Sequence, residues 1–306
     1  MSKSLMLPAP PVVKPKNPPP GPLRRVNPEV LFSMDALRRA WIKVKAVGGA
    51  AGEDGETVER FETDLETNLL ALRSELLKGR YRPRRVLRVF IPKPGGDLRP
   101  LGLWSVRDKI VQRVVYDCIE PYFEREFLDC SYGFRPGRGI ADVVTAVIAH
   151  REAHRRWVAD IDIKKCFDNL DPTLLRRFVR RQVRDPLILK LVQAWLRARV
   201  FNALSGPDTL AGASQGAVIS PLLANVYLHH LDVQLVRRGF HVVRYADDLL
   251  ILERRKQRAE HAMQAAATAL KRIKLEINPF KSRLVHFDEG FQFVGVFFVK
   301  NRHYYL

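Results

Sequence analysis

The sequence predicts an α+β fold, because stretches with helical periodicity alternate with short hairpins of apolar, β-prone residues. Residues 56–79 illustrate the helical pattern. Their apolar side chains recur every three or four positions, at Phe61, Leu65, Leu69, Leu72 and Leu76. Residues 86–103 illustrate the other pattern, because a Pro-Gly-Gly-Asp turn at 94–97 separates two apolar runs.

The remaining elements follow from the same two periodicities. Helices are predicted at residues 29–47, 106–128, 139–155, 171–180, 186–197, 221–237 and 256–273. A strand is predicted at 157–163, a second hairpin at 240–253, and two short strands at 283–287 and 292–299. We expect two lobes that divide near residues 105–130. Residues 1–28 are rich in proline, which predicts an extended, disordered tail.

The charge balance points to a polyanionic partner. Lys and Arg number 52 against 33 Asp and Glu, a formal net charge of +19, and the basic clusters are spread along the chain. A distributed basic surface is typical of proteins that bind a phosphate backbone. Charge alone also leaves open a membrane surface or an acidic protein. No apolar run is long enough to span a bilayer, and the cysteines Cys118, Cys130 and Cys166 cannot all pair, so we expect a reducing, cytoplasmic location and no membrane partner.

Two acidic segments carry the strongest chemical signal. Asp247 and Asp248 lie between apolar runs, where a tight turn would project both carboxylates from a sheet. Adjacent carboxylates repel each other unless a cation neutralises them, and divalent metals take oxygen ligands. Taken alone, the pair also fits an ordinary turn at the surface. The strand predicted at 157–163 places Asp160 and Asp162 on one face and would supply a further carboxylate.

Three such carboxylates would hold two metal ions roughly 3.5–4 Å apart, an arrangement that activates a 3′-hydroxyl and stabilises the leaving pyrophosphate. Here the sequence resembles a known family: residues 162–169 and 245–248 are similar to motifs A and C of reverse transcriptases. Two Mg²⁺ ions, with Mn²⁺ as a substitute, are the cofactors that this resemblance implies. By the same match Asp162 is the ligand in the first segment and Asp160 is not. The implied metal ligands are Asp162, Ile163 through its carbonyl, Asp247 and Asp248.

Further motifs occur in the family's order and imply a nucleotide site. Residues 91–102 resemble the fingers hairpin that clamps a triphosphate, with Lys93 and Arg99 flanking its turn so that both can reach one anion. Residues 213–227 are similar to motif B, in which Gln215 would pack against the nascent base pair. The implied nucleotide-binding residues are Lys93, Arg99, Ile163, Phe167, Gln215 and Lys281, and the implied primer grip is Phe293, Val294 and Gly295.

The amino-acid sequences of residues 101–109 and 131–137 resemble those of enzymes of the group II intron type especially closely. That resemblance implies a right-hand polymerase with an antiparallel palm sheet backed by helices. It assigns residues 29–155 mainly to the fingers and 156–306 mainly to the palm, with no thumb, maturase or endonuclease part. The implied substrates are an RNA template, a DNA primer and dNTPs. Free-standing relatives work beside CRISPR arrays, so a CRISPR integrase or a structured RNA is an implied partner and spacer acquisition from RNA an implied role in defence.

Two other functions fit parts of the sequence. The chain could be a non-catalytic, RNA-binding remnant of an intron-encoded maturase, but the intact Asp162, Asp247 and Asp248 argue against this. It could also be an RNA-templated RNA polymerase. Phe167 argues against that alternative, because a bulky side chain five residues after Asp162 resembles the gate that excludes a ribose 2′-hydroxyl.

Overall fold

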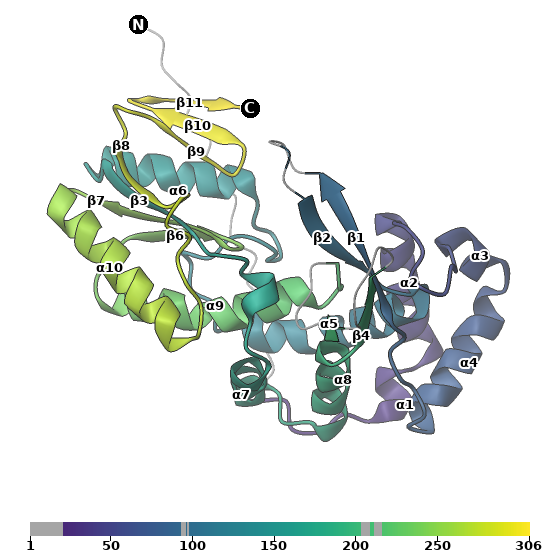
Figure 1. Ribbon diagram of the computed structural model, residues 1–306. Coiled ribbons are helices and arrows are strands. Elements are labelled where there is room, and N and C mark those ends of the chain that lie inside the picture. The colour runs from purple at the N-terminus through teal and green to yellow at the C-terminus, as the bar shows by residue number, and fades with distance from the viewer. Residues whose placement is uncertain (1–20, 93–95, 97, 203–208, 211–215) are drawn as a thin grey trace, which may run out of the picture. The chain divides into compact units, whose positions relative to one another are not determined.

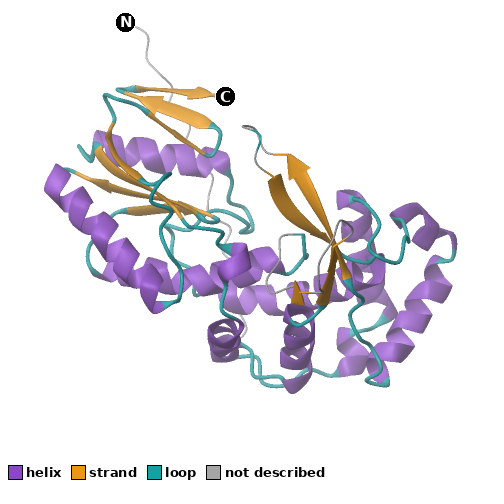
Figure 2. Cartoon of the chain, in the orientation of Figure 1, coloured by secondary structure: helices purple, strands orange, loops and turns teal. Residues whose placement is uncertain are grey.

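The computed structural model describes residues 21–92, 96, 98–202, 209–210 and 216–306, and it contains both helices and strands throughout (Figures 1 and 2). The described chain forms two compact units. We call residues 127–166 and 228–306 the sheet unit, and residues 21–126 and 167–227 the hairpin unit. Residues 1–20 of the predicted tail lie outside the described residues.

A four-stranded antiparallel sheet is the centre of the sheet unit. Its strand order is β6-β7-β3-β8, so β3 and β7 are the two inner strands. The strands are β3 (Trp157–Asp162), β6 (Val242–Tyr245), β7 (Asp248–Glu253) and β8 (Arg283–His286). The predicted strand at 157–163 and hairpin at 240–253 are therefore confirmed.

The two faces of this sheet carry different side chains, because successive residues of a strand point to opposite faces. One face packs Val158 and Leu252 with α6 (Ile140–Glu152) and with phenylalanines of the next sheet. The other face meets α10 (Lys256–Arg272), which lies along β3 and β7 (Figure 1). The buried side of α10 consists largely of alanines, at positions 259, 262, 265, 266 and 269, so the helix can approach the sheet closely.

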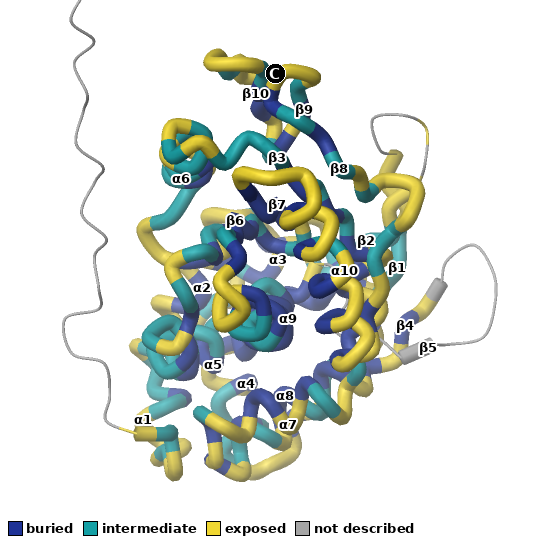
Figure 3. Tube along the Cα trace, turned by 90° about the vertical axis from the view of Figure 1, so that its left-hand side faces the viewer, coloured by how far each residue is buried: buried dark blue, intermediate teal, exposed yellow. Residues whose placement is uncertain are grey.

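A second, three-stranded sheet completes this unit and corrects one prediction. Residues 292–299 were expected to form one strand, but they form parts of β9 (Phe291–Phe293) and β10 (Val296–Val299), joined by a two-residue turn. Both turn residues have positive φ, 46° at Val294 and 77° at Gly295, as in the tight turns that join antiparallel strands. The sequence did not reveal this reversal of the chain, because the apolar run continues through the turn. The outer strand β11 (Arg302–Tyr305), which was not predicted, is mostly exposed (Figure 3).

The hairpin unit surrounds a β-hairpin with helices. β1 (Val86–Pro92) pairs with β2 (Leu98–Leu103) in the predicted hairpin, and β4 (Arg199–Asn202) adds to β1 in parallel. The short strands β4 and β5 (Thr209–Leu210) were not predicted. The helices are α1 (Pro28–Leu31), α2 (Met34–Val47), α3 (Val58–Thr63), α4 (Leu65–Leu77), α5 (Val106–Glu124), α7 (Pro172–Gln182) and α8 (Pro186–Leu196), with a 3₁₀ turn, η1 (Phe167–Asn169). The helix α9 (Ser220–Arg237) begins in this unit and ends in the sheet unit.

Two predicted helices are each divided by a capping residue. The stretch 29–47 separates into α1 and α2 because the Ser33 hydroxyl accepts the N–H of Ala36 and starts a new helix. The stretch 56–79 breaks at Asp64, between α3 and α4. Periodicity alone runs through such breaks, because the apolar spacing continues on both sides.

A buried polar network fixes the base of the hairpin. The carboxylate of Asp108, at the start of α5, accepts hydrogen bonds from the Tyr81 hydroxyl (2.6 Å), the Ser105 hydroxyl (2.7 Å) and the N–H of Arg84 (2.9 Å). The Trp195 indole N–H donates to the Tyr81 hydroxyl at 3.0 Å. These bonds connect α5 and α8 with the segment that enters β1.

The α+β class and the palm-like antiparallel sheet backed by helices are confirmed. The assignment of residues 29–155 to fingers and 156–306 to palm is a functional statement and stays a prediction. Within the described residues, no helix is both long and apolar enough to cross a membrane.

Candidate active site

Two of the predicted carboxylates lie at the paired ends of the inner strands. Asp162 is the last residue of β3, Asp248 is the first of β7, and the two are partners in the strand ladder. Residues paired in an antiparallel ladder have Cα atoms about 4.5–5.5 Å apart and point to the same face. Asp247 precedes Asp248 in the two-residue turn after β6. The sheet therefore brings Asp162, Asp247 and Asp248 to one end of one surface.

Asp160 shares that face but is engaged elsewhere. Its carboxylate accepts a hydrogen bond from the Arg283 guanidinium at 3.3 Å, across the β3–β8 pair. Asp162 is held by its backbone: its N–H donates to the Ser282 hydroxyl at 3.1 Å, and its carbonyl accepts the N–H of Asn278 at 2.8 Å. These bonds fix the main chain of Asp162 and do not use its carboxylate.

Burial and neighbouring charges act on Asp248 at this end of the sheet. Partial burial, followed in order of size by the neighbouring charges of Asp247, Asp162 and Asp160, raises the pKa of Asp248 to about 7. Lys281 acts on the pKa of Asp248 in the opposite direction. Burial and the like charges nearby therefore both disfavour the ionised form of Asp248.

The donors present fit a hard divalent cation such as Mg²⁺. All are carboxylate oxygens, and their mutual repulsion is what such an ion would relieve. Among the residues that the structure describes, no three acidic, histidine or cysteine side chains are already close enough together to form a ready-made metal site. The carboxylates are thus neighbours that would have to converge on an ion.

The other predicted site residues are placed as follows. Ile163 is buried and bridges to Ile277, and Phe293, Val294 and Gly295 end β9 and form the turn before β10. Phe167 opens η1 and is only 7% exposed, and Arg99 lies on β2 opposite Ile91. Lys93 and Gln215 lie outside the described residues. The roles assigned to all of these residues stay predictions.

A buried ion pair behind the turn was missed from the sequence. The Arg244 guanidinium is fully buried and donates to both oxygens of Asp232, at 2.8 and 2.7 Å. It also donates to the Ser131 hydroxyl (2.6 Å) and to the carbonyl of Ala246 (2.7 Å). We call these four residues the turn clamp. The available signal was a lone arginine in the apolar strand Val242–Tyr245, where a charge must find a partner.

The turn clamp holds a strained backbone. Ala246 has φ of 57°, a conformation that favours glycine, and it is the residue directly before Asp247. Residues 130–132 run beside β6: the Arg244 N–H donates to the Cys130 carbonyl (2.7 Å), and the Tyr132 N–H donates to the Arg244 carbonyl (2.9 Å). A Cβ at Gly133 would lie 2.5 Å from the Ala246 nitrogen, so this segment can pass the turn only as glycine.

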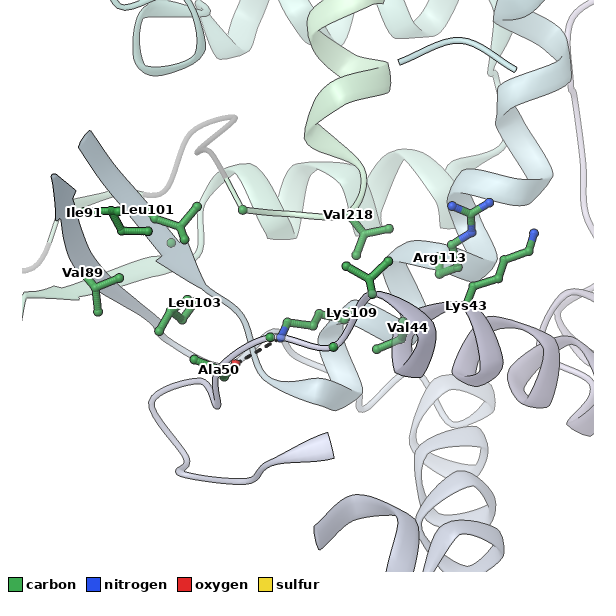
Figure 4. A pocket seen from close by; sticks show the side chains of 15 residues that line it. Lys43, Val44, Ala50, Val89, Ile91, Leu101, Leu103, Lys109, Arg113 and Val218 are labelled. Carbon is green, nitrogen blue, oxygen red and sulfur yellow. Dashed lines mark hydrogen bonds between the residues drawn. The ribbon is translucent and has the colours of Figure 1, made fainter. Parts of the chain in front are cut away.

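A cavity of the hairpin unit lies beside β1 and β2. This cavity, the hairpin pocket, has a volume of about 640 Å³ and is walled by Val89, Ile91, Leu101 and Leu103 from the hairpin and by residues of α2 (Figure 4). Basic side chains border it, and Lys109 donates to the carbonyl of Ala50 at 3.2 Å. Burial lowers the pKa of Lys109, against the effect of Asp54. The pocket combines apolar walls with cations, which suits a planar base with an anionic backbone.

Gly216 closes one side of the hairpin pocket by a backbone contact. Its φ is 109°, and a Cβ there would overlap the carbonyl oxygen of Gly102 on β2. Any larger residue must push the segment before α9 away from the hairpin.

Paired aspartates at the end of an antiparallel sheet, on a strongly basic chain, define a polymerase of the palm type as the class of protein. Residues 91–298 match the family model described as reverse transcriptase (RNA-dependent DNA polymerase), and since this is more than half of the chain, the chain belongs to that family. It is accordingly an RNA-directed DNA polymerase by family.

Individual relatives agree with this assignment. The chain is 32% identical to Protein YkfC of Escherichia coli (strain K12), over 83% of this chain and 77% of YkfC. It is 34% identical to the group II intron-encoded protein LtrA of Lactococcus lactis subsp. cremoris, over 55% of this chain but only 28% of LtrA. The group II intron type is confirmed. A solved structure of telomerase from Candida albicans with a fragment of telomeric RNA has a TM-score of 0.55 at 13% identity, over 74% of this chain and 47% of that one, which supports the fold.

The turn clamp leads to a first prediction. Asp232→Asn should lower the free energy of unfolding by about 3–5 kcal/mol, because it leaves the buried Arg244 charge without a counter-charge. The double variant Arg244→Met with Asp232→Leu should recover most of that loss but should not recover primer extension, since the Ala246 carbonyl has lost its donor. Urea unfolding and primer extension measure the two effects. Full activity in the stable double variant would contradict the positioning role.

The backbone contact at Gly216 leads to a second prediction. Gly216→Ala should raise the KM for dNTP at least about tenfold, because the displaced segment deforms the hairpin pocket. Gly239→Ala is the matched control: Gly239 also has a positive φ, of 74°, but a Cβ there meets only the end of the Arg258 side chain at 3.5 Å. Equal effects of the two substitutions on KM would show that backbone strain, and not the contact with Gly102, is responsible.

Proposed function

We propose that this chain extends a DNA primer on an RNA template by two-metal nucleotidyl transfer, with Asp162, Asp247 and Asp248 as the metal ligands. The observation that carries the proposal is the register of the palm sheet, which pairs Asp162 with Asp248 at the strand ends beside Asp247. Two bound Mg²⁺ ions would supply the charge that activates the primer 3′-hydroxyl and stabilises the departing pyrophosphate.

The chain's own groups around the carboxylates have separable tasks. The hydrogen bonds from Asn278 and to Ser282 fix the backbone of Asp162, and the turn clamp fixes the backbone before Asp247. The Lys281 ammonium acts to lower the pKa of Asp248, and Lys281 is proposed to bind the nucleotide. The β9–β10 turn at Val294 and Gly295 is the proposed primer grip.

The hairpin pocket is proposed to seat the template base and its incoming partner. Its apolar hairpin wall would contact a base, and the basic residues at its border would meet backbone phosphates. Lys93 and Arg99, on either side of the hairpin turn, are proposed to bind the triphosphate, and Gln215 to contact the nascent pair. Phe167 is the proposed gate against ribonucleotides.

The biological setting that we propose is spacer acquisition from RNA together with a CRISPR integrase, in the cytoplasm. The resemblance of the motifs to free-standing group II-like enzymes supports the setting, and the cysteines Cys118, Cys130 and Cys166, which cannot all pair, support a reducing location. Affinity purification of the chain from its native cells, followed by identification of the proteins that co-purify, tests the integrase as partner.

The metal assignment leads to a third prediction. Asp162→Asn and Asp248→Asn should each lower primer extension by at least about a hundredfold, because each removes a charge that holds the ions. Asp248→Asn should not lower the melting temperature, since it also removes like-charge repulsion. Asp160→Asn is the matched control on the same face and should keep activity within a few-fold, because Asp160 pairs with Arg283. Loss of activity in Asp160→Asn with retention in Asp162→Asn would reverse the assignment.

The proposed gate leads to a fourth prediction. Phe167→Val should raise incorporation of ribonucleotides, because a smaller side chain leaves room for the 2′-hydroxyl. The measurement is the ratio of kcat/KM for dNTP to that for rNTP, which should fall by about tenfold or more. Leu170→Val, a similar truncation of a buried residue three positions on, is the control for altered packing. An unchanged ratio in Phe167→Val would place the discrimination at another residue.

A further inference from the structure

Helix α7 carries an exposed arginine face. One side of the helix is buried through Leu175, Phe178 and Val179, and its other side is basic. The exposed arginines on this side and in the turn that follows are Arg176, Arg177, Arg180, Arg181 and Arg184, which we call the arginine face. Residues four apart on a helix lie about 6 Å apart along its axis, so the face presents a row of cations at short, regular intervals.

The acids nearest to the arginine face in sequence are the N-cap residues Asp171 of α7 and Asp185 of α8. Neither α7 nor α8 contains an acidic residue. The Asp171 carboxylate caps α7 by accepting the N–H of Leu174 at 2.8 Å. The Asp185 carboxylate is buried and accepts the N–H groups of Ile188 and Val26, at 2.8 and 2.9 Å. Arg177 and Arg181 lie over the Phe178 ring, 5.5 and 5.6 Å from its centroid, and both residues are exposed.

A small cavity opens between α7 and α8 at the edge of the arginine face. Its volume is about 100 Å³, several times what a single water needs. Its inner wall is apolar, with Val179, Leu189, Val192 and Leu196, and its rim carries the polar side chains of Thr173, Arg176, Gln193 and Arg197. Arg176 belongs both to this interhelix pocket and to the arginine face, so the two features form one continuous surface.

This combination matches the chemistry of an unpaired nucleotide in RNA. Apolar walls accept the flat face of a base, and a hydroxyl and an amide can read its edge. Guanidinium groups contact phosphates and also stack on bases. An acidic protein would also use the arginines, and the test below therefore includes it as an outcome.

We propose that α7 and α8 form a second RNA-binding site, in which the interhelix pocket takes one unstacked base of an RNA loop and the arginine face holds the adjoining phosphates. The site uses none of the residues proposed for catalysis. Its ligand class is a structured RNA with an unpaired loop, and this class is distinct from the primer–template duplex.

The test is fluorescence polarisation of two labelled RNAs with the full chain, in EDTA and without dNTPs. One RNA is a stem with an unpaired loop, and the other is the same stem as a blunt duplex. Leu189→Trp, which fills the interhelix pocket, should weaken binding of the looped RNA about tenfold or more and leave the duplex unaffected, because one stacked base is lost. Thr173→Trp fills the pocket from its exposed rim and serves if the first variant folds poorly.

A salt series distinguishes the contribution of the arginines to RNA binding from that of the pocket. Arg180→Ala should weaken both RNAs and lower the slope of log Kd against log salt by about 0.7–0.9, because one phosphate contact is lost. Lys190→Ala, which removes an exposed charge of α8 outside the pocket, should leave the slope unchanged. Asp248→Asn should bind both RNAs like the wild type, so failure of the metal proposal and failure of this one are distinguishable.

Three results would overturn the proposal. They are unchanged binding of the looped RNA by both pocket-filled variants, equal slopes for Arg180→Ala and Lys190→Ala, or binding of an acidic polypeptide that neither RNA can compete away. The last result would assign the arginine face to an acidic protein.

Discussion

The ion pair between Arg244 and Asp232 is the constraint on which the candidate active site depends. It is fully buried, so the two charges must remain together, and the same guanidinium also binds the Ser131 hydroxyl and the Ala246 carbonyl. One side chain thus joins α9, the segment before α6, and the turn that carries the paired aspartates. A glycine at position 133 then lets the chain pass within contact distance of that turn.

Whereas Arg244 and Asp232 attract each other, the carboxylates at the strand ends repel one another. Their positions follow from the strand ladder, but partial burial and the like charges of the neighbouring carboxylates raise the pKa of Asp248 to about 7. Backbone order is supplied by the turn clamp and by the bonds of Asp162 to Asn278 and Ser282. The fold therefore contributes the arrangement, and a bound cation would contribute the missing attraction.

Local patterns in the sequence were sufficient for the fold class, the main hairpins and the position of the three aspartates at one end of the sheet; the role of the aspartates as metal ligands stays a prediction. They were insufficient where the decisive interaction is tertiary. The run at 292–299 conceals a reversal, because Val294 is an unusual residue for a left-handed turn position. The partnership of Arg244 with Asp232 spans a helix and a strand, and the Gly216 contact joins segments more than a hundred residues apart. The spacing of apolar residues along the sequence does not predict such contacts.

The pairing of Asp162 with Asp248 also sets how this site can be altered. Because the two residues are ladder partners, the separation of their Cα atoms is set by hydrogen bonds between main chains and not by neighbouring side chains. Substitutions elsewhere in the sheet can change its stability while leaving that spacing nearly constant. The distance between the two carboxylate groups can then be changed through the length of the acidic side chain, in steps of one methylene. Few acidic side chains are consequently available at each strand end for adapting the proposed site to a larger or smaller ion.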